Sequence, residues 1–246
     1  MPKLELRNIS HAFADAPKDY ILQDINFYVE EGEIVSIIGP SGGGKSTIFN
    51  IVAGLFQPTT GEVWLSGQNI TGQSGHVSYM LQKDLLLPFK TVLDNVALPK
   101  IIQGEEKKKA REAAAKFFEE FGLSGTEFKY PKMLSGGMRQ RAALLRTYLF
   151  EKEMTLLDEP FSALDAITKE NIHQWYLDIM QKINLTTLFI THDIEEAILL
   201  SDRIYILKGR PAQISESIRI DLPRPRDPLG EEIVRLKREI KKEYLQ

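Results

Sequence analysis

Two kinds of hydrophobic pattern occur along this chain. Residues 3–9 and 20–29 carry apolar side chains at every second position, which is typical of strands with one exposed face. Later runs at 33–38, 154–157 and 187–190 are mostly apolar, which favours strands buried on both faces of a parallel sheet. The pattern therefore predicts an antiparallel layer ahead of a mainly parallel core. Further strands are expected at 61–67, 77–81, 203–207 and 213–220.

Helical periodicity separates these strands. Apolar residues spaced three and four apart predict a helix over 48–55 and an amphipathic helix over 105–121 that ends at Gly122. A proline-rich break at 222–228 precedes a closing helix. The apolar face of that helix is expected at Ile233, Leu236, Ile240 and Tyr244.

One long segment of the chain lacks the strand patterns found on either side of it. Residues 84–150 show helical patterns and predict an inserted α-helical subdomain. The α/β core is then expected at 1–83 and 151–220, with 221–246 as a C-terminal extension of the same single domain.

The composition of the chain argues against several classes of function. The 246 residues are 43% hydrophobic and 26% charged, with a formal charge of -3, so no global field for nucleic acid is expected. Cysteine is absent, which excludes disulfides and thiol chemistry. The N-terminus alternates charged and apolar residues and does not resemble a signal peptide, and no apolar run approaches the roughly 18 residues of a membrane span. Any membrane role is expected to depend on a partner.

A glycine-rich stretch after the run 33–38 matches G-x-x-x-x-G-K-[ST], the pattern of a phosphate-binding loop. It consists of Gly39, Pro40, Ser41, Gly42, Gly43, Gly44, Lys45, Ser46 and Thr47. Glycines let successive N–H groups turn toward an anion, Lys45 adds charge for the β- and γ-phosphates, and Ser46 offers a hydroxyl to Mg²⁺. Because a strand precedes the stretch and a helix follows it, the sequence predicts an α/β fold with a P-loop NTPase core.

Polar residues follow the ends of other predicted strands. Asp158 and Glu159 suit a division of labour, with one carboxylate near Mg²⁺ and the other as the base for a water, although a solvated turn is the alternative. His192 ends another strand, and Gln82 can coordinate Mg²⁺ or a water, or can simply terminate its strand. Ligands bind at the carboxyl edge of parallel sheets, so we expect these groups to converge on one γ-phosphate.

Two further features suit a nucleotide. Ser135, Gly136 and Gly137 begin a helix and can bind a second anion, although an ordinary N-cap is the commoner use of such residues. Phe13 can stack on a purine or serve in packing, and Tyr20 is the competing aromatic residue.

Together these motifs resemble the ATP-binding cassette (ABC) family over nearly the whole chain. The matching segments are 39–47, Gln82, 134–140, 156–159, 162–165 and His192. The resemblance implies an ATPase that binds ATP and Mg²⁺, in which Asp158 serves Mg²⁺ through water and Glu159 is the general base. It also implies that His192 contacts the γ-phosphate, that Gln82 links the site to a membrane partner, and that Phe13 stacks on adenine. Asp165, Lys45 and Ser135 to Gly137 join this nucleotide site by the same resemblance.

The resemblance also implies partners. In this family the signature segment of one subunit covers the ATP of the other, which predicts a head-to-tail dimer of this chain on the cytoplasmic face of a membrane. Separate permease subunits and, indirectly, an extracellular solute-binding protein are implied, and nucleic acid is not. The signature departs from the common form at Met138, where glutamine is usual, and residues 144–148 are unusual.

A finer resemblance concerns the cargo. Residues 86–89, 91–96 and 222–226 look like those of nitrate, sulfonate and taurine importers and their thiamine-precursor relatives. The primary hypothesis is therefore the ATPase subunit of an importer. The alternatives are a soluble ABC ATPase acting on nucleic acid or ribosomes, an exporter ATPase, or a non-catalytic nucleotide sensor.

Overall fold

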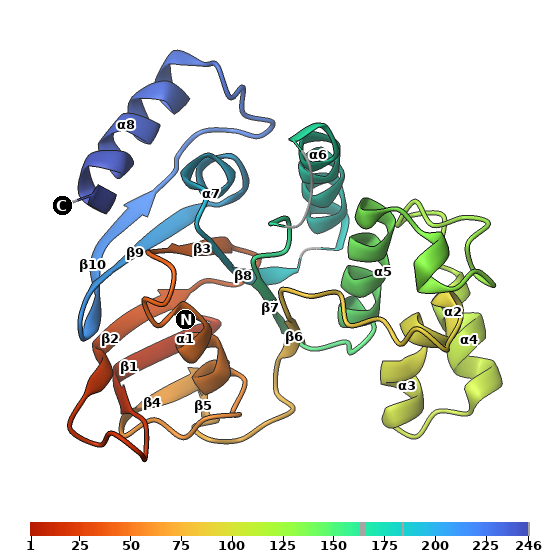
Figure 1. Cartoon of the computed structure of the whole chain (residues 1–246), viewed down its shortest axis with the longest axis horizontal. Coiled ribbons are helices and arrows are strands. Elements are labelled where there is room, and N and C mark those ends of the chain that lie inside the picture. Colours follow the sequence, from red (N-terminus) through yellow and green to blue (C-terminus); the bar gives the residue numbers. More distant parts are fainter. Residues whose placement is uncertain (163–165, 184, 246) are drawn as a thin grey trace.

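The computed structural model describes residues 1–162, 166–183 and 185–245. Within them, ten strands form one sheet in the order β5-β4-β1-β2-β10-β9-β3-β8-β7-β6 (Figure 1). The strands are β1 (Leu4–Ala12), β2 (Tyr20–Val29), β3 (Ile34–Ile38), β4 (Thr60–Leu65), β5 (Gln68–Asn69), β6 (Ser78–Met80), β7 (Met154–Asp158), β8 (Thr186–Thr191), β9 (Arg203–Gly209) and β10 (Ala212–Arg219). The helices are α1 (Lys45–Val52), α2 (Val92–Val96), α3 (Leu98–Ile102), α4 (Lys107–Ala115), α5 (Gly136–Tyr148), α6 (Ala166–Ile183), α7 (Ile194–Leu200) and α8 (Glu231–Leu245), with a 3₁₀ turn η1 (Pro131–Met133).

The sheet has two halves that follow the two sequence patterns. β1 pairs antiparallel with β2 and β4, whereas β6, β7, β8, β3 and β9 run parallel to one another. β3 is buried at every position because helices cover both of its faces. Val35 and Ile37 belong to the same apolar cluster as α1, and Ile38 packs in the cluster that contains α7. The predicted fold, a mainly parallel α/β core with an N-terminal antiparallel layer, is confirmed.

Two helix predictions are wrong in extent. Leu55 lies beyond the end of α1 and is exposed. Helix α4 stops at Ala115, and hydrogen-bonded turns follow it as far as Gly122. Phe118 and Phe121 belong to these turns, and their rings are buried in the core. Tertiary packing, and not a continuous helix face, therefore places them there.

Residues 84–150 hold helices α2 to α5 and, among the described residues, no strand of the sheet. Figure 1 shows this segment on one side of the sheet, beyond β6. Its apolar side chains nevertheless share one core cluster with β7 and α6. The subdomain boundaries expected from the sequence, 84–150, remain a prediction.

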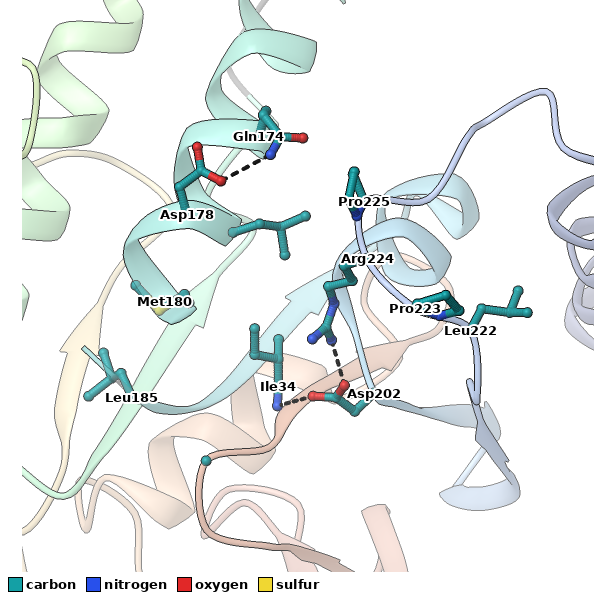
Figure 2. A pocket seen from close by; sticks show the side chains of 12 residues that line it. Ile34, Gln174, Asp178, Met180, Leu185, Asp202, Leu222, Pro223, Arg224 and Pro225 are labelled. Carbon is teal, nitrogen blue, oxygen red and sulfur yellow. Dashed lines mark hydrogen bonds and ion pairs between the residues drawn. The ribbon is translucent and has the colours of Figure 1, made fainter. Parts of the chain in front are cut away.

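The C-terminal segment crosses the amino ends of the parallel strands before α8. Ile233 and Ile240 of α8 pack in the cluster that contains α7, and the side chain of Tyr244 lies outside the described part. We call residues 222–226 the strap. A cavity of about 440 Å³ lies between the strap and α6, and Arg224 in its lining pairs with Asp202 at 2.8 Å. Figure 2 shows the side chains that line this cavity.

Candidate nucleotide site

The phosphate loop joins the end of β3 to the start of α1. Gly44 stands at the N-cap of α1 with φ of 93°, and a Cβ there would lie 2.7 Å from Leu22 of β2. A Cβ on Gly39 would lie 2.8 Å from the carbonyl oxygen of Leu207 in β9. Side chains at either position would collide with the sheet, so the close packing of the loop requires glycine.

Lys45 is folded into this loop and is only 6% exposed. Its Nζ donates hydrogen bonds to the carbonyl oxygens of Gly39 at 2.7 Å and Pro40 at 2.9 Å. Burial lowers the pKa of Lys45, and the nearby charges of Glu159 and Asp158 oppose that shift. The loop therefore concentrates a cation where backbone N–H groups at a helix start also favour an anion.

Asp158 is the last residue of β7 and faces the loop. The hydroxyl of Ser46 donates to its Oδ2 at 3.3 Å. Burial raises the pKa of Asp158, and the hydrogen bond from Ser46 opposes that shift. A hydroxyl beside a carboxylate is an oxygen donor set that a hard cation such as Mg²⁺ prefers.

Glu159 carries the second carboxylate on a constrained backbone. Its φ is 45°, a left-handed conformation that is unfavourable for a residue with a side chain. Its N–H donates to the carbonyl oxygen of Ile190 in β8 at 3.0 Å, so the neighbouring strand holds the turn. Glu159 Oε2 accepts a hydrogen bond from Gln82 Nε2 at 3.0 Å and lies 3.3 Å from His192 Nδ1.

These groups surround one cavity of about 540 Å³. Its lining consists of Phe13, Ile21, Ser41, Gly42, Gly44, Lys45, Ser46, Thr47, Gln82, Glu159 and His192. The convergence follows from strand register, since Ile38 pairs with Thr191 and Asp158 pairs with Ile190 in parallel ladders. The carboxyl ends of three strands thus meet at one edge.

Of the two candidate aromatic residues, Phe13 lines this cavity and Tyr20 does not. The ring of Phe13 packs edge-on against His11 and Phe56, with centroids 5.1 and 5.9 Å apart. These two supporting rings are not predictable from the sequence, because nothing in the pattern brings residue 56 to residue 11. An aromatic surface held in this way can stack on a base.

Comparisons with known proteins agree with this geometry. Residues 22–162, more than half of the chain, match the sequence profile of the ABC transporter family. The chain belongs to the ABC transporter family. The formylaminopyrimidine import ATP-binding protein ThiZ of Halalkalibacterium halodurans is 48% identical over 200 residues, which cover 81% of this chain and 78% of the relative. The nitrate import ATP-binding protein NrtD of Synechocystis is 37% identical over 237 residues, which cover 96% of this chain and 89% of the relative.

A solved ABC cassette provides a structural comparison. A dimeric ATP-binding cassette in a post-hydrolysis state, bound to ADP and phosphate, is 29% identical, with a TM-score of 0.76 over 89% of this chain and 100% of that chain. The expected resemblance to the nitrate and sulfonate importer group and the expected ABC ATPase activity are confirmed. The chain binds ATP as a member of this family. Among the described residues, no helix is both long enough and apolar enough to traverse a bilayer.

The signature segment of this ABC cassette lies apart from the cavity. Ser135 caps α5 by accepting a hydrogen bond from the N–H of Met138 at 3.3 Å. Neither Ser135 nor the following Gly136 and Gly137 lines the cavity that contains Lys45. The structure therefore brings together the phosphate loop, Gln82, Glu159 and His192 with Asp158 behind them, but not the signature. Asp165 lies outside the described residues.

Proposed function

We propose that this chain is the ATP-hydrolysing subunit of an importer, and that two copies work beneath a separate membrane permease. The observation that carries the proposal is the meeting of Lys45, Glu159 and His192 around one cavity of about 540 Å³. The names of the relatives, which are import ATP-binding proteins, support the direction of transport.

The side chains suit separate steps of hydrolysis. Lys45 and the loop N–H groups bind the β- and γ-phosphates, and Phe13 stacks on the adenine. The Glu159 carboxylate accepts the proton of the attacking water, for which it is held by Gln82 at 3.0 Å. The His192 imidazole hydrogen-bonds the γ-phosphate and orients that water, and its Nδ1 already lies 3.3 Å from Glu159.

Mg²⁺ is the metal that fits the donor set. Ser46 and Asp158 would hold it, with Gln82 as a further oxygen donor, because Mg²⁺ binds few protein groups and shares its shell with water and substrate phosphates. When bound, the ion neutralises charge on the phosphate oxygens. The 3.3 Å hydrogen bond between Ser46 and Asp158 keeps both oxygen donors on the same side of the loop.

A second copy completes the site. Ser135, Gly136 and Gly137 form a helix start suited to the γ-phosphate but do not line the cavity of their own chain. A head-to-tail dimer supplies them, with Asp165, to the ATP of the partner copy. The dimeric state of the solved cassette supports this arrangement. Closure with ATP and release after hydrolysis then shift the population between two states.

The permease is proposed to bind the apolar surface that follows Gln82. We define this apolar surface by Leu85, Phe89, Phe128, Tyr130 and Met133, all exposed. Single exposed apolar residues are ordinary on a protein surface, so the proposal requires that these five residues of the inserted helical segment form one patch. This arrangement places the chain on the cytoplasmic face of the membrane, with a solute-binding protein on the other side. The proposed cargo is a nitrate, sulfonate, taurine or thiamine-precursor type of solute.

The role of Glu159 is tested by Glu159→Gln. We expect phosphate release to fall about 10²-fold or more while ATP binding and ATP-dependent dimerisation persist, because the amide cannot accept the proton. The matched control is Glu119→Gln, the same change at an exposed position in the helical segment, which should keep parental turnover. Undiminished hydrolysis in Glu159→Gln would contradict the assignment of the base.

The transport role needs a separate experiment. Tagged Glu159→Gln is purified from native membranes, and the proteins that accompany it are identified by mass spectrometry. A multi-span permease with a solute-binding protein supports the importer, and the ligand of the latter identifies the cargo. Soluble partners, nucleic acid or an exporter permease would contradict it.

A further inference from the structure

The backbone on both sides of His192 is held by hydrogen bonds, whereas its ring is more than half exposed. The His192 side chain is 54% exposed, so packing alone does not hold it beside Glu159. The N–H of Asp193 donates to Thr191 Oγ1 at 3.0 Å. Asp193 Oδ1 in turn accepts hydrogen bonds from the N–H groups of Glu195 at 3.0 Å and Glu196 at 3.3 Å, which caps α7. The position of the imidazole therefore depends on how firmly this helix start is held.

Lys169 of α6 holds that helix start from outside the cavity. Its Nζ lies 2.6 Å from Asp193 Oδ2 and 2.8 Å from Glu196 Oε2. The Glu196 side chain is 2% exposed, and a carboxylate this deeply buried requires a cationic or hydrogen-bonding partner. Burial alone would lower the pKa of Lys169, but hydrogen bonds to the two carboxylates outweigh it and raise that pKa. The lysine is therefore charged at neutral pH.

The same helix also contacts the segment that carries Glu159. His173, one turn after Lys169, places Nε2 3.6 Å from Glu196 Oε2. Its ring packs edge-on against Phe161 with centroids 4.8 Å apart. Phe161 follows Glu159 by two residues, so α6 contacts both strand ends whose side chains meet at 3.3 Å.

We propose that Lys169 is a positioning residue for ATP hydrolysis, which fixes the start of α7 so that His192 stays beside Glu159. The inference rests on the proposed roles of His192 and Glu159. Lys169 does not line the nucleotide cavity, so it acts through Asp193 and Glu196 rather than on ATP. A positioning role predicts a loss in kcat with little change in KM, whereas a residue that contacted ATP would change KM.

The first test compares Lys169→Met with Lys169→Arg in the full-length protein. We expect Lys169→Met to lower kcat about tenfold while KM for ATP changes less than about twofold, since small displacements of an orienting group lower the rate. Lys169→Arg keeps the cation and should retain at least about half of kcat. Lys182→Met is the control, since Lys182 is an exposed lysine in the last turn of the same helix and should leave turnover unchanged.

Loss of the lysine can also destabilise the fold, because the buried Glu196 carboxyl would lose its cationic partner. The variant Lys169→Met/Glu196→Gln removes the lysine together with the glutamate carboxyl, so no buried acid is left at position 196 without its cation. The double variant still lacks the ion pair with Asp193, so its kcat should fall about tenfold, as in Lys169→Met alone. Parental kcat in this folded double variant would overturn the proposal.

A double-mutant cycle with His192→Ala decides whether Lys169 acts through His192. We expect Lys169→Met to lower single-turnover hydrolysis about tenfold in the parent but less than about twofold in His192→Ala, because the group that it positions is then absent. Equal losses in both backgrounds would overturn the proposal. A parent that hydrolyses no ATP, or a His192→Ala variant with parental activity, would instead overturn the proposed function or the role of His192, and the proposal with it.

Discussion

The two ends of strand β3 use a buried cation in opposite ways. At the carboxyl end, Lys45 donates to two carbonyl oxygens of its own loop and faces a cavity. At the amino end, Arg226 is 9% exposed and donates to carbonyl oxygens of Ile198, Ser201, Ile220 and Leu222. Burial lowers the pKa of both, that of Arg226 to about 10. The partners of Lys45 are carbonyl groups of its own loop, and a phosphate can replace them. The partners of Arg226 lie in two other segments, 198–201 and 220–222.

The surroundings of Arg226 explain why that end is structural. Helix α7 ends with carbonyl groups that have no partner inside the helix, and Arg226 and Arg224 supply donors to them. Asp202 accepts from Arg224 and, at 2.9 Å, from the N–H of Ile34 at the start of β3 (Figure 2). The strap thus ties the end of α7 to the start of β3, on the side of the sheet away from the nucleotide cavity.

The largest expected effect follows from removing the charge of Lys45 at the nucleotide site. Lys45→Met should lower ATP turnover about 10²–10³-fold, because a charge aimed at the transferred phosphate is lost. Its free energy of unfolding should stay within about 1 kcal/mol of the parent, since its partners are carbonyls of one loop. Phosphate release and urea unfolding measure the two quantities. A large loss of stability without loss of turnover would show that Lys45 is structural.

Arg226→Met should give the reverse result. We expect the free energy of unfolding to fall by about 3 kcal/mol, because several buried carbonyl groups lose their donor. The kcat of the folded fraction should stay within about twofold of the parent, since Arg226 lies away from the nucleotide cavity. Urea unfolding and phosphate release again measure both, with Arg219→Met, an exposed arginine on β10, as the control. A large loss of kcat in folded Arg226→Met would contradict the conclusion that Arg226 has a purely structural role.

The smallest effect concerns the carboxylate that faces Lys45. Burial raises the pKa of Asp158 in the folded state, so its contribution to stability is fully present below the ordinary aspartate pKa and is lost as pH rises through the raised value. Asp158→Asn should therefore raise the free energy of unfolding near neutral pH by about 1 kcal/mol while impairing hydrolysis. The gain should shrink as pH falls toward about 4. A gain that does not depend on pH would contradict this explanation.

Much of the site was predictable because its motifs lie at strand ends. The apolar runs before Gly39 and Asp158 and at 187–190 predicted buried parallel strands, and parallel pairing then brought Gly39, Glu159 and His192 to one edge. Side chains that act from other elements were not predictable in this way. Lys169 precedes Asp193 by 24 residues, and its hydrogen bond depends on how α6 packs.

Local sequence patterns predicted the backbone least well where a turn, and not a helix, carries a buried aromatic ring. The helix expected over 105–121 stops at Ala115, yet Phe118 and Phe121 are still in the core. The helical spacing of these residues correctly indicates that they are buried, but it does not determine whether a helix or a turn carries them. The same limit applies to Phe13 and Tyr20, which stand at the two ends of the connection between β1 and β2, because only the folded turn decides which one lines the cavity.

The sequence by itself determined the family, the order of the elements and the chemical groups of the site, because burial periodicity and glycine loops are local properties. The tertiary structure decided which side chains meet, including the 3.3 Å approach of His192 to Glu159 and the closure of α7 by Arg226. These contacts join residues that are 25 or more positions apart, and their geometry depends on how strands and helices pack together rather than on spacing along the chain.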